Sequence, residues 1–209
     1  MNKEEIERLD NMRVYENYAY ENGYKFVCGV DEAGRGPLCG PVVAAAVILP
    51  KDVHLEGVND SKKLTEKKRE KLYDDIMENA LAVGVGMSDI DVIEEINILG
   101  ATKEAMKQAI NNLVIKPDYV LIDGNQNISI DIDRQTVVSG DAKSESIAAA
   151  SIIAKVTRDR MLRQYDIEYP EYGFAKHKGY GTKAHIEAIK EYGLTPIHRP
   201  SFCTKFVNK

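Results

Sequence analysis

Four acidic residues follow short apolar runs in this chain of 209 residues, and each run has a glycine nearby. Asp31 and Glu32 end the first run and precede Gly34, whereas Asp123 and Asp141 end two later runs. Short apolar runs predict buried strands, and sites in open α/β sheets lie at the carboxyl ends of strands. One aspartate at a strand end usually belongs to a turn, but four acids at three such ends indicate a shared site.

Such a group of carboxylates favours one kind of chemistry. Carboxylates a few ångströms apart repel one another and change their pKa values unless a cation neutralises them. All-oxygen ligands select hard divalent ions, Mg²⁺ or Mn²⁺, over zinc. Two such ions about 4 Å apart would activate a water molecule and stabilise the leaving oxygen of a phosphodiester. The sequence therefore predicts phosphoryl transfer to water, with these four acids as metal ligands and catalytic groups.

The neighbouring positions of Asp31 and Glu32 pose a geometric difficulty. Side chains alternate along a regular strand, so the two carboxylates would point to opposite faces of the sheet. Both serve one site only if the strand ends or twists there, and Gly34 and Gly36 give the backbone that freedom. Taken alone, this stretch is equally compatible with an acidic turn after a strand.

The elements that would position the acids form an α/β fold with a mixed central sheet flanked by helices. The apolar pattern predicts strands, the first two as an antiparallel hairpin, over residues 24–31, 40–49, 81–87, 119–123 and 135–140. It predicts helices over residues 1–20, 66–80, 90–114, 144–169 and 183–191. We expect one domain over residues 1–209, with an N-terminal helix within residues 1–22 and a C-terminal helical extension from about residue 165.

Composition limits the class of protein. Hydrophobic residues make up 44% of the chain, which is enough for a full core, and the formal net charge is −5. The three cysteines are odd in number and lack metal-ligand spacing, so we expect reduced thiols. The chain has neither an apolar run of membrane-spanning length nor a charged leader, so we expect a cytoplasmic protein without a membrane segment. We also expect it to be a monomer.

Basic residues are not spread evenly. A negative total with local positive patches is compatible with a focused polyanion site, although each patch taken singly is more often a solvated helix face. The two clusters contain Lys62, Lys63, Lys67, Lys68, Arg69 and Lys71, and Lys176, Lys178, Lys183, Arg199, Lys205 and Lys209.

Six motifs in order along the chain resemble those of ribonuclease HII. They are residues 29–37 (GVDEAGRGP), 60–64 (DSKKL), 121–124 (LIDG), 140–143 (GDAK), 149–159 (AASIIAKVTRD) and 177–182 (HKGYGT). The resemblance extends over nearly the whole chain and implies a ribonuclease H-like fold. It also implies an endonuclease that cuts the RNA strand of RNA/DNA hybrids and incises 5′ to single ribonucleotides in duplex DNA. The implied products carry 3′-hydroxyl and 5′-phosphate ends, and the implied role is ribonucleotide removal in DNA repair and replication.

The resemblance also implies roles for individual residues. It assigns two divalent ions to Asp31, Glu32, Asp123 and Asp141, and we expect Asp31 to be the shared ligand. It assigns recognition of the 2′-hydroxyl to Gly34, Arg35 and Gly36, in keeping with the close approach that glycine allows to a sugar. It assigns stacking at the RNA-to-DNA junction to Tyr180.

Other basic residues and the histidines are less specific. We expect phosphate contacts from Lys62, Lys143 and Lys178, although a surface role at a helix start explains Lys143 nearly as well. Arg199 is compatible with a helix cap or with a phosphate contact. We interpret the remaining candidates as structural or surface residues: His177, His185 and His198.

Three alternatives remain at this point. The ribonuclease HIII family shares the four acids. It usually has a lysine in place of Arg35 and an added N-terminal domain, and the segment before Asp31 is too short for such a domain. A non-catalytic hybrid-binding module is disfavoured, since four carboxylates would repel a polyanion without metal. The basic patches and the loop around Tyr180 disfavour a small-molecule metal phosphatase.

Overall fold

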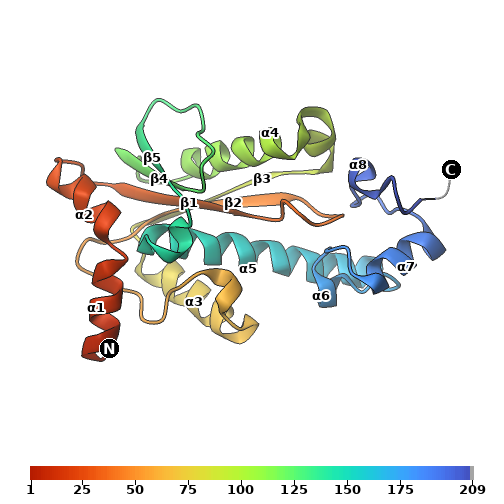
Figure 1. Ribbon diagram of the computed structural model, residues 1–209, viewed down its shortest axis with the longest axis horizontal. Coiled ribbons are helices and arrows are strands. Elements are labelled where there is room, and N and C mark those ends of the chain that lie inside the picture. The colour runs from red at the N-terminus through yellow and green to blue at the C-terminus, as the bar shows by residue number, and fades with distance from the viewer. Residues whose placement is uncertain (208–209) are drawn as a thin grey trace.

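A five-stranded mixed sheet forms the centre of the molecule, with strand order β3-β2-β1-β4-β5 (Figure 1). β2 pairs antiparallel with both β1 and β3, whereas β4 pairs parallel with both β1 and β5. The strands are β1 (Val27–Ala33), β2 (Val42–Ile48), β3 (Ala82–Ser88), β4 (Tyr119–Asp123) and β5 (Asp133–Val137). The prediction of a mixed α/β sheet with an antiparallel hairpin is confirmed.

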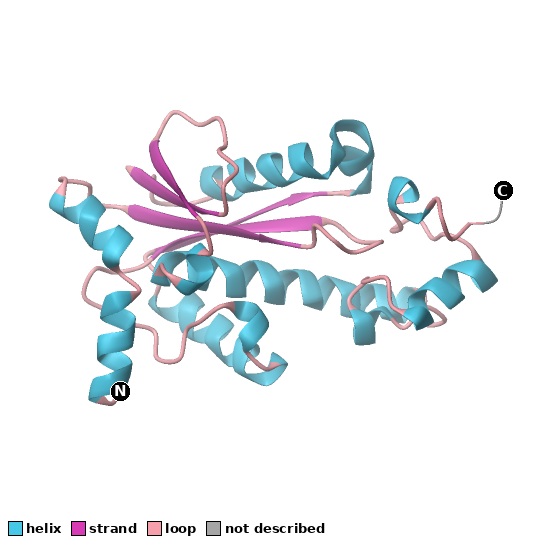
Figure 2. Ribbon diagram, viewed as in Figure 1, coloured by secondary structure: helices cyan, strands magenta, loops and turns pink. Residues whose placement is uncertain are grey.

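Helices cover both faces of the sheet (Figure 2). α4 lies on one face, and α5 lies on the other with α3 packed beyond it. The helices are α1 (Lys3–Asn11), α2 (Val14–Glu21), α3 (Glu66–Asn79), α4 (Ile90–Asn111), α5 (Glu145–Glu168), α6 (Phe174–His177), α7 (Lys183–Tyr192) and α8 (Pro200–Cys203). Among residues 1–207, the 3₁₀ turns η1 (Ser61–Lys63) and η2 (Gly140–Ala142) precede α3 and α5.

The computed structural model describes residues 1–207. Asn208 and Lys209, which belong to the predicted domain, lie outside the described residues. Within these residues, no helix combines the length and the apolar character that crossing a bilayer requires. α6, α7 and α8 form the expected C-terminal helical extension, at the opposite end of the molecule from α1 and α2 (Figure 1).

α5 packs directly against β1 at Gly29, because no side chain stands between the two backbones there. A Cβ atom on Gly29 would lie 2.2 Å from the backbone carbon of Ser146, so only glycine allows this approach. The alanines of α5 over residues 148–150 are fully buried in the same layer. This contact fixes the strand that carries Asp31 against the helix that follows Asp141.

Three predicted boundaries were wrong. The single helix expected within residues 1–22 breaks at Arg13, whose buried side chain reaches Glu145 instead of continuing the helix surface. The first strand runs to Ala33, so Asp31 and Glu32 lie inside it. The last strand ends at Val137, because Ser139 adopts the left-handed conformation (φ +56°) and Asp141 lies on η2.

Candidate metal and nucleic-acid site

Asp31 lies in β1 with its buried side chain on the side of Ser151 in α5. β1 runs parallel to β4, which brings Asp31 beside Asp123 at the end of that strand. Burial raises the pKa of Asp31 well above its usual value, and the charges of Glu32 and Asp123 add to the rise. Negative charge is therefore concentrated here.

Asp123 connects β4 to the turn that carries Asp141. Its Oδ1 accepts the backbone N–H of Gly140 at 2.6 Å and that of Asp141 at 3.4 Å. The bonds hold η2 against the end of β4, so Asp141 reaches the same edge of the sheet from a turn. Burial raises the pKa of Asp141, and the charges of Asp123 and Asp60 contribute.

Glu32 lies on the opposite face of β1 from Asp31, as strand alternation requires. Its carboxylate and Asp123 nevertheless line one pocket, beside Arg35 and Lys103. Burial raises the pKa of Glu32, the charge of Arg35 opposes the rise, and that of Asp123 adds to it. The ion pair of Glu32 with Arg35 is 3.5 Å long. Glu32 therefore approaches the other acids around the end of β4.

Lys62 is the cation that faces this group. Burial lowers its pKa, but the surrounding carboxylates, Asp141 and Asp31 first, raise it above its usual value. Asp60, which was not singled out by sequence reasoning, caps η1 by accepting the N–H of Lys62 at 2.9 Å. The residues of η1 therefore reach the acids from a loop far from them in the sequence.

The other two predicted phosphate contacts point elsewhere. Lys143 donates from Nζ to the carbonyl of Val138 at 2.8 Å. Lys178 donates to the carbonyl of Ala175, and its Nζ lies 3.7 Å from a carboxylate oxygen of Glu66. Both lysines donate hydrogen bonds to backbone carbonyls, so their contact with phosphate stays a prediction.

The glycine-arginine-glycine stretch and Tyr180 lie side by side. A Cβ atom on Gly36 would lie 3.9 Å from the ring of Tyr180. The backbone N–H of Leu38 donates to the carbonyl of Gly179 at 2.8 Å, which joins the two loops. The side chains of Arg35 and Tyr180 are half exposed, at 49% and 46%. Both side chains are available to a ligand.

The donor atoms in this group fit a hard divalent ion. All four acids offer carboxylate oxygens, and burial with mutual repulsion leaves their charge only partly balanced by Lys62 and Arg35. Over residues 1–207, no three of these acids bring oxygens within 4.8 Å of one another.

A different trio, Cys39, His185 and His198, does bring its donor atoms within 4.8 Å. The two Nε2 atoms are 3.0 Å apart, and Nδ1 of His185 faces the carbonyl of Tyr180. The N–H of Thr195 donates to Nδ1 of His198 at 2.9 Å, so the proton of that imidazole is on Nε2. The histidines therefore donate and accept in one hydrogen-bonded chain, in agreement with their structural interpretation.

Residues 28–205 match the family described as Ribonuclease HII. The chain belongs to the ribonuclease HII family. It is 61% identical over 205 residues to Ribonuclease HII of Acetivibrio thermocellus, which covers 98% of this chain and 80% of that protein. The fold is therefore ribonuclease H-like, and the chain is a ribonuclease H endonuclease that hydrolyses RNA in RNA/DNA hybrids with divalent metal.

Solved structures agree with the family. The crystal structure of the ribonuclease H2 from Pyrococcus horikoshii OT3 superposes with a TM-score of 0.73 at 32% identity, covering 87% of this chain and 97% of that one. The structure of Bst-RNase HIII in complex with Mn2+ has a TM-score of 0.60 at 20% identity over 84% of this chain and 65% of that one, which shows the fold alone. The family match decides between ribonucleases HII and HIII.

Proposed function

We propose that this ribonuclease incises duplex DNA 5′ to single embedded ribonucleotides, leaving 3′-hydroxyl and 5′-phosphate ends, and that it acts in ribonucleotide removal during DNA repair and replication. The observation that carries the proposal is the position of Gly36 beside the Tyr180 ring: a Cβ atom on Gly36 would lie 3.9 Å from that ring. A glycine backbone can approach a 2′-hydroxyl closely, and an aromatic ring can stack on the next sugar or base. Such a pair would recognise one RNA-to-DNA junction.

We propose that Asp31, Glu32, Asp123 and Asp141 hold two ions, Mg²⁺ or Mn²⁺. The ions supply a nucleophilic water and stabilise the leaving oxygen when bound. Asp31, on which the charges of both Glu32 and Asp123 act, would be the shared ligand, and Asp123 also fixes η2 through Gly140. The other residues of the chain position the substrate around them.

The substrate contacts follow from charge and exposure. Gly34, Arg35 and Gly36 contact the ribose, and the exposed guanidinium of Arg35 is free to turn from Glu32 to a phosphate. Lys62 attracts the scissile phosphate because it faces the acids. The remaining phosphate contacts are assigned to Lys143 and Lys178. We further propose one catalytic domain over residues 1–209 that acts as a cytoplasmic monomer.

The test is cleavage of a duplex with a single ribonucleotide, beside a long RNA/DNA hybrid and an all-DNA duplex, with Mg²⁺ or Mn²⁺ titrated. We expect cuts 5′ to the ribonucleotide, none in all-DNA duplex, and none after chelation. Cleavage of the hybrid alone would refute recognition of single ribonucleotides. Metal-independent binding without turnover would favour the non-catalytic module instead.

A further inference from the structure

Arg199, just before α8, is fully buried and holds the loop between β1 and β2, residues 34–41. A guanidinium has five N–H groups, and five hydrogen bonds run from Arg199 to carbonyls of this loop. Its acceptors are Gly34 at 2.6 Å, Arg35 at 3.1 Å, Pro37 at 2.9 Å, and Gly40 at 2.9 and 2.6 Å. Two acceptors belong to the residues proposed to contact the ribose.

A second buried arginine holds the other side of the same loop. Arg158 of α5 donates to the carbonyls of Cys39 at 2.8 Å and Pro41 at 3.0 Å. It also donates to the carbonyl of Lys178 at 2.9 Å, two residues before Tyr180. A Cβ atom on Gly34 would lie 2.2 Å from Nε of Arg158, so the loop is packed tightly between the two guanidinium groups.

Arg199 has no ion-pair partner among residues 1–207. Burial lowers its pKa to about 10, and the nearby charge of Arg158 contributes. Keeping an unpaired charge in a protein interior is costly unless hydrogen bonds compensate. If this loop only had to be packed against the rest of the protein, apolar side chains could do so at a lower cost in free energy. The planar donors of arginine instead fix the directions of several carbonyls at once.

We propose that Arg199 is a positioning residue for ribonucleotide selectivity, which fixes the backbone of Gly34–Gly36 against the Tyr180 ring. The inference rests on the proposed function. A single embedded ribonucleotide must bind in one register, with its 2′-hydroxyl at the glycines and the junction at the ring. A long hybrid has a 2′-hydroxyl at every position, so many registers are productive and a displaced loop is tolerated.

The test compares kcat/KM for the one-ribonucleotide duplex with kcat/KM for a long hybrid. In Arg199→Lys the ammonium has three donors in place of five, so the loop loses hydrogen bonds while the positive charge stays. We expect the ratio of the two constants to fall by about tenfold or more, since small misplacements of substrate contacts reduce rates strongly. Cleavage of the hybrid should change by less than about threefold.

Phe202→Leu is a second variant that keeps the proposal falsifiable if Arg199→Lys does not fold. The Phe202 ring lies 5.2 Å from Cζ of Arg199 and covers the guanidinium, so its loss should lower the ratio in the same direction by a smaller factor. The matched control is Arg134→Lys. Arg134 also holds a loop, donating to the carbonyls of Ile130 at 2.9 Å and Ile132 at 3.2 Å, but outside the site.

The control should lower the melting temperature and leave the ratio unchanged. The proposal is overturned if folded Arg199→Lys or Phe202→Leu keeps the wild-type ratio, or if Arg134→Lys lowers it equally. Wild-type protein that cuts hybrids but not the one-ribonucleotide duplex would instead overturn the proposed function, and this inference with it.

Discussion

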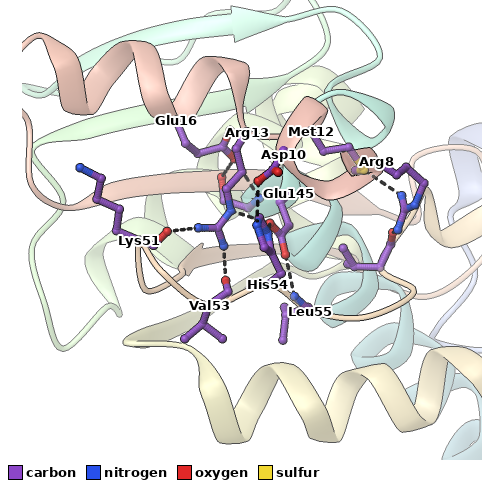
Figure 3. Close-up of polar contacts among 12 residues, drawn as sticks. Arg8, Asp10, Met12, Arg13, Glu16, Lys51, Val53, His54, Leu55 and Glu145 are labelled. Carbon is purple, nitrogen blue, oxygen red and sulfur yellow. Dashed lines mark hydrogen bonds and ion pairs between the residues drawn. The ribbon is translucent and has the colours of Figure 1, made fainter. Parts of the chain in front are cut away.

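Breaking the buried ion pair between Arg13 and Glu145 should destabilise the fold strongly (Figure 3). Nε of Arg13 lies 2.5 Å from Oε2 of Glu145, and the two side chains are 5% and 0% exposed. Arg13 also donates to the carbonyls of Lys51 and Val53, while Glu145 accepts the N–H of Leu55 at 2.7 Å. The pair joins the N-terminal helices to the first turn of α5.

Removing one partner leaves the other charge buried without its ion pair, although in Arg13→Met His54 Nδ1 still lies 2.9 Å from Oε2 of Glu145. Such a loss typically costs about 3–5 kcal/mol, so Arg13→Met and Glu145→Leu should each lower the free energy of unfolding by that amount. The double variant buries no charge and loses only hydrogen bonds, among them that of Leu55. It should cost about 1–3 kcal/mol, less than either single change.

Urea denaturation followed by circular dichroism at pH 7.5 measures all four proteins. With an m value of about 2 kcal/mol/M, the midpoint of each single variant should fall by about 1.5–2.5 M. The control is Lys71→Met, which breaks a pair of the same length, 2.5 Å, but whose lysine is 75% exposed. It should change stability by less than about 1 kcal/mol.

Two results would refute this reasoning. One is a loss below about 1 kcal/mol in Arg13→Met, which would mean that His54, 2.9 Å from Oε2 of Glu145, or water stabilises the carboxylate without Arg13. The other is a double variant that costs the sum of the single changes, which would mean that the charges contribute independently.

Three further predictions concern other parts of the molecule. Asp31→Asn should abolish cleavage with either metal yet melt no lower than wild type, since it removes a buried charge among like charges; wild-type turnover would contradict this. Gly29→Ala should cost at least about 2 kcal/mol in urea denaturation, because the new Cβ would lie 2.2 Å from the backbone of Ser146; an unchanged midpoint would mean that β1 and α5 part easily. Burial lowers the pKa values of His185 and His198 from 6.5 to about 4, so both stay neutral in the folded state while the unfolded chain takes up protons. The free energy of unfolding should therefore fall as the pH falls from 6.5 to about 4, by at most about 1.4 kcal/mol per pH unit for each proton. In urea denaturation at a series of pH values, His198→Gln should show a smaller fall.

Much of the fold and of the acidic group could be predicted from local pattern. Apolar runs identified β1 to β4 and the major helices, because burial of a sheet between helices requires such runs. The polar strand β5 overlaps its predicted range only at residues 135–137. Parallel neighbours that end together bring acids such as Asp31 and Asp123 to one edge, so their proximity followed from the order of the elements. The element ends were less predictable, since local contacts decide them: Asp123 accepts N–H groups from η2, and the last strand stops before Asp141.

By itself, the sequence determined the class of fold, the acidic group and the family motifs, all of which depend on residue type and short spacing. Only the tertiary structure decided what the buried arginines do. Arg13 lies at the break between α1 and α2 and pairs with Glu145. Arg199 donates hydrogen bonds to carbonyls that lie 159 to 165 positions away in the chain. Every residue has the same backbone carbonyl group. The sequence therefore does not show which carbonyls a buried arginine will bind. The position of such a side chain emerges only once the chain has folded.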